Sequence, residues 1–455
     1  MGFQDIPTST APWLRELAAH VDYAYFRRVW QHAVTEQAEQ GFIAACYENV
    51  AKRANSEGEY YLAHDAANHG LRCAAAADFP PHRLIAAKST ALARSGATCE
   101  AQHVLDEFLT KHEADGSVCS AQARLLRDRG LAAQSGEERS RLMTEAAKWA
   151  AQAKTFARQE GADWSYPANQ EVQFLYFAGQ HETARAKALL VIEFIEQRVD
   201  HGSMWNQTNL AEMRLVLSEL DRAGEHYAKA AALSVQSPGD LAANRAVAAL
   251  LLAEVSGDDK LLDKWFPKPV LLIFAGHIPD CAVREAPRLP EKICRMDGPA
   301  ALALTKIIAK MGVVEGISAG APGGDILFAE ALLATRGRIT LMEPFPLRRI
   351  REVANNCGYD WSTRLERIYE KASHIQAITC AEDVDGDTQC DYANYVMLGT
   401  AILRTKRING QLRAIVLWDE ADAAAPKPGG TGHFVKLCRD AHIPIDIINP
   451  NTLNA

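Results

Sequence analysis

The sequence predicts a helical domain followed by an α/β domain with a parallel sheet. Before residue 265 the chain is rich in Ala, Leu, Glu and Arg, and its apolar residues recur three and four apart, the spacing of amphipathic helices. From residue 270 on, short apolar runs alternate with glycine-rich turns and helix-forming stretches, which is typical of a parallel sheet. Residues 265–269 (WFPKP) separate the two textures, and their prolines end the preceding helix. We therefore assign residues 1–264 to the helical domain and residues 268–455 to the α/β domain.

Composition limits the classes of function. The chain has 455 residues, enough for two or three domains, and its 48% hydrophobic and 23% charged content is that of a globular protein. A net charge of −8 argues against direct nucleic-acid binding, which usually needs a basic face. There is no run of eighteen apolar residues and no signal-peptide pattern at the start, so we expect a cytoplasmic protein without membrane contact.

The cysteine pattern gives no sign of a metal site. The ten cysteines form no Cys-x-x-Cys pair, and no histidine near Cys380 and Cys390 completes a zinc set. Neither a metal site nor a cofactor is predicted.

The helical domain shows a degenerate repeat. Residues 91–105, 175–186 and 215–231 each combine a helix that carries small residues, a short turn and a second helix that opens near alanine. This is the plan of tetratricopeptide repeats, whose period is about 34 residues. Small residues let paired helices approach closely, and stacking then buries a continuous core. We expect a tetratricopeptide-like solenoid that binds a protein partner and could also support a homo-oligomer.

Part of this solenoid carries a resemblance of its own. Residues 161–184 and 205–212 resemble the TRAF-binding region of apoptosis-signal-regulating kinases and its bacterial relatives. The resemblance covers about residues 120–255. In that family the region is a repeat scaffold that regulates an attached domain. It implies an interaction or relay module here, and not TRAF binding as such.

The first of two glycine turns lies at residues 316–325 (GISAGAPGGD), between an apolar run and a strong helix former. Glycines let the backbone approach a ligand closely. The free amides at the start of the following helix favour a phosphate or carboxylate. The pattern is neither Gly-x-Gly-x-x-Gly nor a P-loop. On its own it is equally compatible with a tight turn that binds nothing.

A second glycine turn strengthens the case for a ligand. Residues 412–418 (LRAIVLW) read as a strand that Asp419 ends, and residues 428–433 (PGGTGH) lead into a further helix. In an open parallel sheet both turns lie at the carboxyl edge of the strands, where such sheets bind ligands. Two facing turns can hold a phosphate together with a base or ribose. The predicted ligand is therefore a nucleotide or a nucleotide derivative.

These motifs resemble the SLOG superfamily. The resemblance rests on residues 318–325, the strand that ends at Asp419, and residues 429–431, and it covers about residues 268–450. The superfamily includes the DNA-processing protein A fold, the "lonely guy" phosphoribohydrolases and bacterial conflict-system nucleotide sensors. The run 270–277 and the motif 391–395 (DYANY) are similar to its repeat-linked bacterial members. The resemblance implies a Rossmann-like nucleotide-binding domain.

One departure from the family concerns catalysis. The phosphoribohydrolases carry a glutamate three residues after the threonine of their second glycine motif, whereas this chain has Phe434 there. The departure weakens a transfer of their hydrolase activity.

The candidate site residues are glycines of the turns and polar residues at strand ends. Asp325 could also serve only as a helix cap, and Ser318 only as a turn residue. Glu330 and Glu343 are candidate general acids or bases, although Glu330 could instead face outward. The candidates for ligand binding are Gly276, Ser318, Gly320, Gly323, Gly324, Asp325, Asp419, Gly429, Gly430 and Thr431.

Three functions remain open. The main hypothesis is a nucleotide sensor whose repeat module relays ligand binding to a partner or oligomer, and the conflict-system resemblance suggests stress or phage defence. The second is hydrolysis of an N-glycosidic or phosphoribosyl bond, with Glu330 or Glu343 assisting and the turn amides holding the phosphate. The third is a repeat scaffold without a ligand. Phe434 favours sensing over catalysis, and the intact glycines disfavour the scaffold.

Overall fold

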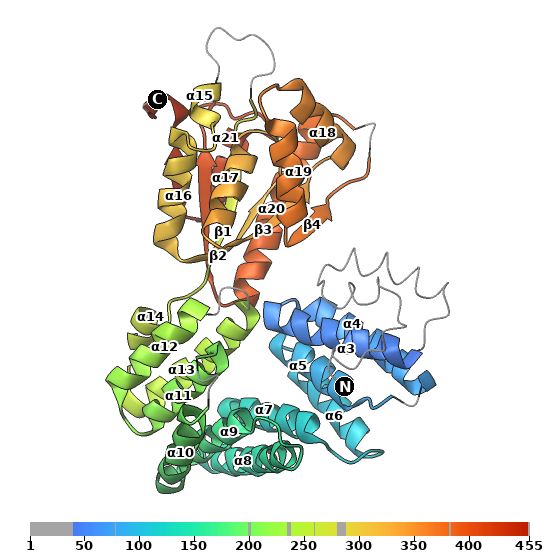
Figure 1. Cartoon of the computed structure of the whole chain (residues 1–455), viewed down its shortest axis with the longest axis vertical. Coiled ribbons are helices and arrows are strands. Elements are labelled where there is room, and N and C mark those ends of the chain that lie inside the picture. The colour runs from blue at the N-terminus through green and yellow to red at the C-terminus, as the bar shows by residue number, and fades with distance from the viewer. Residues whose placement is uncertain are drawn as a thin grey trace. The chain divides into compact units, whose positions relative to one another are not determined.

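A helical domain is followed by an α/β domain with an all-parallel sheet, as predicted (Figure 1). The computed structural model describes residues 40–77, 79–198, 202–233, 238–258, 260–279, 288–381 and 384–453. The chain divides into two compact units, one up to Pro267 and one from Lys268 on. The N-terminal stretch used for the signal-peptide argument lies outside the described residues. Within them, no helix is long and apolar enough to span a membrane.

The described part of the first unit consists of helices, and most helices that follow one another in the chain pack against each other. Small residues permit this packing. A Cβ on Gly70 would fall 2.9 Å from the Cβ of Tyr47 and 2.6 Å from a methyl group of Leu84, so only glycine lets these helices approach so closely. The helices are α3 (Gln40–Glu57), α4 (Tyr60–Ala77), α5 (His82–Arg94), α6 (Thr98–Leu109), α7 (Gly116–Ala132), α8 (Gly136–Gln159), α9 (Ser165–Phe177), α10 (His181–Glu196), α11 (Met204–Val216), α12 (Leu220–Leu233), α13 (Pro238–Ser256) and α14 (Leu261–Trp265).

Short-range signals set the ends of these helices. The Asp115 carboxylate accepts hydrogen bonds from the amides of Ser117 and Val118, both 2.9 Å, and caps α7. Gly161 and Gly179 take the left-handed conformation, with φ of 65° and 83°, just after α8 and α9 end. The ends of these helices are thus specified by residues close to them in the sequence.

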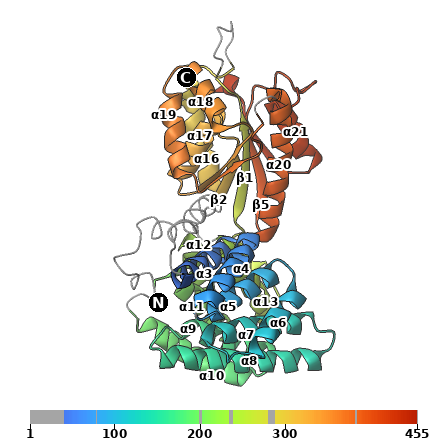
Figure 2. The same cartoon turned by 90° about the vertical axis from the view of Figure 1, so that its right-hand side faces the viewer.

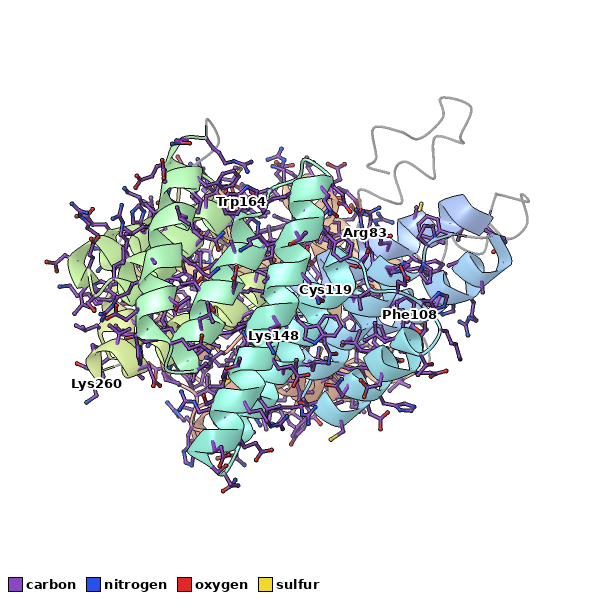
Figure 3. All side chains as sticks on the ribbon, turned by 90° about the horizontal axis from the view of Figure 1, so that it is seen from below. Arg83, Phe108, Cys119, Lys148, Trp164 and Lys260 are labelled. Atoms are coloured by element: carbon purple, nitrogen blue, oxygen red, sulfur yellow. The ribbon has the colours of Figure 1, made fainter. Side chains whose placement is uncertain are left out.

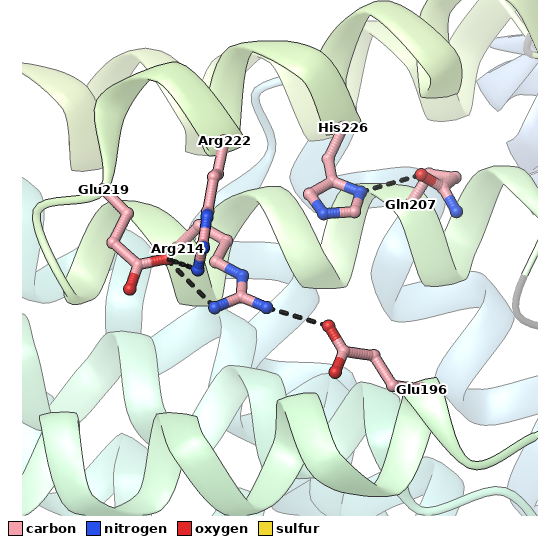
Figure 4. Close-up of polar contacts among 6 residues, drawn as sticks. All are labelled: Glu196, Gln207, Arg214, Glu219, Arg222 and His226. Atoms are coloured by element: carbon pink, nitrogen blue, oxygen red, sulfur yellow. Dashed lines mark hydrogen bonds and ion pairs between the residues drawn. The ribbon is translucent and has the colours of Figure 1, made fainter.

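Aromatic and polar contacts hold the helices together on their outer sides. Trp164, labelled in Figure 3, lies at the start of α9 and packs on Phe194 of α10 with ring centroids 3.9 Å apart. Arg158 lies 4.3 Å over the indole. Arg214 on α11 bonds Glu196 of α10 at 2.8 Å and Glu219 at 3.0 Å (Figure 4). These contacts join α8 to α10 and α10 to α11, so the order of the stack is specified by side chains as well as by turns.

The second unit is built on one six-stranded sheet. Its order is β4-β3-β2-β1-β5-β6, and every pair of neighbours is parallel. Because β2 and β5 flank β1, the direction of strand addition reverses beside β1, which makes this the topological switch point. The strands are β1 (Val270–Gly276), β2 (Val313–Ser318), β3 (Arg338–Glu343), β4 (His374–Ala377), β5 (Gln411–Leu417) and β6 (Ile445–Ile448).

Helices cover both faces of the sheet (Figure 2). Side chains alternate along β1: Leu272 and Phe274 enter the core on one face, and Leu271 and Ile273 enter the core on the other. The first face carries α16 (Pro299–Met311), α17 (Gly324–Ala334), α18 (Leu347–Asn356) and α19 (Trp361–Lys371), and the second carries α20 (Gly386–Arg407) and α21 (Thr431–Asp440). Two short helices, α15 (Glu291–Cys294) and η2 (Pro450–Thr452), complete the described part of this domain.

Candidate functional site

Topology brings both glycine turns to the carboxyl edge of the sheet. The first turn joins β2 to α17 and the second precedes α21 after β5, so the turns follow the two strands that flank β1. Gly276 of β1 is level with Leu417 of β5. Just beyond them, His277 Nε2 lies 3.0 Å from Asp419 Oδ1 and ties the two strand ends together. The edge where open sheets bind ligands is therefore built from β1, β2 and β5.

Backbone conformation and close packing at the end of β1 require glycines in the first turn. Gly320 and Gly323 have φ of 73° and 97°, a region that side chains avoid. A Cβ on Gly323 would fall 2.6 Å from the carbonyl oxygen of His277, and one on Gly324 would fall 2.9 Å from the Cα of Gly276. The predicted glycines Gly323 and Gly324 thus pack against Gly276 and His277 at the end of β1, whereas Gly320 lies near Leu341 of β3 and Tyr369 of α19.

Asp325 lies under this turn rather than on its surface. Its carboxylate is buried and accepts a hydrogen bond of 3.1 Å from the Ala321 amide. Burial raises the pKa of Asp325 to about 7, although the amides of Ala321, Ala319 and Gly320 act in the opposite direction. The turn amides therefore already face a carboxylate of the chain itself, and that carboxylate changes charge near neutral pH.

Polar atoms without partners lie at the same edge. Ser318 ends β2, is fully buried, and its hydroxyl has no hydrogen-bond partner among the described residues. The hydroxyl of Tyr369 lies near the same turn, 3.5 Å from where a Cβ on Gly320 would lie, and it interacts with the Glu343 carboxylate. On α20, the Nδ2 of buried Asn394 also has no hydrogen-bond partner among the described residues. Buried polar groups are nearly always bonded, so these atoms indicate a place for water or a ligand.

Glu343 and Glu330, the two candidate acids, have different surroundings. Glu343 ends β3 at the carboxyl edge, and burial raises its pKa. The neighbouring Tyr369 has a raised pKa as well, because it is buried and close to the Glu343 charge. Glu330 instead accepts two hydrogen bonds from Arg364 of α19, at 2.9 and 2.5 Å. That pairing between helices argues against Glu330 as a general acid or base.

The second turn packs on the start of α20. Gly429 has a φ of 75°, and a Cβ on it would fall 2.7 Å from the Cβ of Cys390. Gly430 is the N-cap of α21, and Thr431 is the first residue of that helix. A Cβ on Gly432 would fall 2.6 Å from the carboxylate of Asp422, which accepts a hydrogen bond of 2.7 Å from the Trp418 indole. An acidic side chain of the chain thus lies against this helix start too.

Cys390 of α20 packs against the second turn. It contacts the second turn through Gly429, and its pKa is raised to about 11 by burial, then by Asp387 and Asp325. Asp325 belongs to the first turn, so its charge contributes to the raised pKa of Cys390. Asp419 follows β5 at this edge: burial opposes its ionisation, but the Ala421 amide and His277 lower its pKa. It is fixed as an anion that faces His277.

Sequence reasoning missed His277, Cys390 and Asp422 as members of this edge. His277 and Cys390 meet their partners across long stretches of chain, so no local pattern indicated them. Asp422 could have been found, because it lies four residues after Trp418, whose buried indole needs an acceptor. Among the described residues, no group of three or more His, Cys, Asp or Glu could hold a metal ion.

No protein-family model matches the chain, and no curated protein has a significantly similar sequence.

Proposed function

We propose that the α/β domain is a SLOG-like, Rossmann-type module that binds a nucleotide or nucleotide derivative at its carboxyl edge. We further propose that the helical domain is tetratricopeptide-like and relays ligand binding to a protein partner or to another copy of the chain. The observation that carries the proposal is the Ser318 hydroxyl, fully buried and unpartnered beside a glycine turn at the switch point. A ligand that forms a hydrogen bond with the Ser318 hydroxyl would remove the cost of leaving it unsatisfied.

Sensing is favoured over hydrolysis by the surroundings of two side chains. Phe434, at the position where the phosphoribohydrolases carry glutamate, is fully buried in the core between the sheet and α21. Glu330 is held by Arg364. Glu343 is the remaining candidate acid, and its burial and raised pKa support the hydrolase alternative. We extend the sensing proposal to stress or phage defence on the strength of the resemblance to conflict-system sensors.

A ligand screen tests the binding proposal. Mono-, di- and cyclic nucleotides and NAD-derived molecules would be added to the full chain in a thermal-shift assay, followed by calorimetry. A ligand at a hundred times its Kd stabilises by about 2.7 kcal/mol, which raises Tm measurably. The proposal would be wrong if no member of this panel raised Tm.

Ser318→Ala sharpens the screen. Its free protein should be as stable as wild type, because the lost hydroxyl has no partner, but its nucleotide affinity should fall about tenfold, or 1.4 kcal/mol. Ser362→Ala on α19 is the matched control and should bind normally. Unchanged affinity in Ser318→Ala would place the ligand elsewhere.

Product analysis separates the sensor from the enzyme. The bound nucleotide would be incubated with wild type and with Glu343→Gln, and free base or ribose phosphate would be measured by chromatography. We expect no product from either protein. Product from wild type that is lost in Glu343→Gln would establish the hydrolase alternative.

A further inference from the structure

The helical domain contains a cavity of its own, separate from the carboxyl-edge site. Its volume is about 260 Å³, and α5, α7, α9, α11 and α13 contribute to its walls. Asn169, Asn209 and Glu212 line it, each no more than 4% exposed. So many buried polar side chains around one hollow are unusual for a helical core, where polar groups are normally exposed.

The polar network inside the cavity is incomplete. The Glu212 carboxylate accepts hydrogen bonds from Asn169 at 2.5 Å and Gln173 at 2.7 Å. The carbonyl oxygens of Asn169 and Gln170 have no partner among the described residues, and neither does the amide nitrogen of Asn244. Residues that line the cavity therefore carry unused acceptors on α9 and an unused donor on α13. A molecule that both donates and accepts hydrogen bonds would satisfy them.

Arg124 places a guanidinium at the wall of the cavity. Its guanidinium donates to the hydroxyls of Tyr166 at 3.0 Å and Thr90 at 2.8 Å, and no carboxylate in the described part of the chain pairs with it. Arg127, which also lines the cavity, is instead paired with Asp128 at 2.7 Å. A guanidinium with free donors favours a carboxylate, which it can bind through two hydrogen bonds.

We propose that this cavity binds a small molecule with a carboxylate and an amino group, the chemistry of a free amino acid. The carboxylate pairs with Arg124 and accepts from Asn244. The ammonium group donates to the open carbonyls of Asn169 and Gln170. The volume corresponds to about nine water molecules, at roughly 30 Å³ each, which suits one small metabolite. Trp205, 44% exposed, offers an apolar surface to the ligand's side chain.

Calorimetry on the full chain tests the proposal with each of the twenty free amino acids as probes. At least one should bind. For that amino acid, the amide form without the carboxylate charge and the N-acetyl form without the ammonium should each bind at least tenfold more weakly. If none of the twenty binds, or if blocking the carboxylate leaves the affinity unchanged, the proposal is wrong.

Two variants place the ligand in the cavity. Arg124→Gln should weaken binding at least tenfold, whereas Arg141→Gln, an exposed control on α8 that pairs with Glu145, should bind as wild type does. Asn244→Ala is a second test that should not disturb folding, because the Asn244 amide nitrogen has no hydrogen bond to lose. Its Tm should equal that of wild type, while its affinity for the amino acid should fall. Normal affinity in both Arg124→Gln and Asn244→Ala would overturn the assignment. Because Ser318→Ala lies in the other domain, it should not change amino-acid binding, and failure of the nucleotide screen would leave this result unaffected.

Discussion

At the scale of single residues, the most informative groups are buried carboxyls. Glu212 in the helical domain and Asp325 in the α/β domain each have a pKa raised to about 7, in both cases by burial. Amide donors surround both, but they do not fully replace water. Each group therefore holds a proton in the folded state at a pH where the unfolded chain has lost it.

This difference makes stability depend on pH. The unfolded pKa of a glutamate is about 4.3, so the folded chain binds the extra proton between that value and about 7. Unfolding free energy should fall as pH rises through this window, by roughly 3 kcal/mol from Glu212 alone. Urea unfolding of the helical domain at pH 5 and pH 8 measures the loss. Glu212→Gln should show a smaller loss, and the exposed control Glu145→Gln on α8 should behave as wild type does. Equal losses in all three proteins would mean that Glu212 is charged throughout.

The role of a residue could be predicted from the sequence only where its surroundings are formed by residues close to it in the chain. The pattern of the first turn was enough to single out Ser318 and Asp325, since a strand end and a helix start are local features. The pattern could not show that Glu330 pairs with Arg364, because the two residues are far apart in the sequence and meet only when α17 packs near α19.

At the scale of elements, the pairing of α17 with α19 is the best tested by substitution. Arg364 is 1% exposed, bonds Glu330, and stacks on Trp361 with 4.4 Å to the ring centroid. It also donates to the carbonyl of Cys294 at 3.0 Å, so it joins three helices.

Breaking this pair should destabilise the domain strongly. Arg364→Ala leaves Glu330 partly buried without its cation, and loss of one partner of a buried pair costs about 3–5 kcal/mol. Chemical unfolding of Arg364→Ala, Glu330→Gln and the double variant gives the coupling energy. Nucleotide affinity should stay unchanged in Glu330→Gln, and a tenfold loss there would return Glu330 to the binding site.

The first turn gives a second test at this scale. A side chain on Gly324 meets the backbone of Gly276, which cannot move without shifting β1, so Gly324→Val should lower stability by about 1–3 kcal/mol and abolish nucleotide binding. Gly399→Ala, exposed on α20 with open space around it, is the matched control and should gain about 0.5–1 kcal/mol. Melting curves of both variants measure these changes in stability. A fully stable Gly324→Val would show that the turn is not packed on β1.

Elements were predictable where their own sequence specified them. Strands β1, β2, β3, β5 and β6 lie in apolar runs beside glycine turns or helices, and the helical domain shows its 3.6-residue period. Strand β4 was not predicted, because its residues are half-buried or exposed and no apolar run indicates them. The strand order could not be read from the sequence either, because it depends on which strands pair across the fold.

At the scale of the whole molecule, the proposals give each domain a ligand: a nucleotide for the α/β domain and an amino acid for the helical domain. A relay requires that occupancy of one domain change the energetics of the other. Two domains that merely share a chain would each respond to their own ligand alone. The difference between these cases is measurable without knowing the partner.

Hydrogen exchange on the full chain measures the relay directly. Saturating nucleotide should slow amide exchange in the α/β domain around Ser318, since binding stabilises the state that contains the site. If the helical domain relays this signal, peptides from α9 to α14 should also change their exchange rates, because their local opening free energy is coupled to ligand binding. At a nucleotide concentration near the wild-type Kd, both changes should be much smaller in Ser318→Ala, because a tenfold weaker site is then mostly empty, whereas Ser362→Ala should respond as wild type does. Changes confined to residues after Lys268 would show that the domains respond independently, and the relay would then be wrong even though the nucleotide binds.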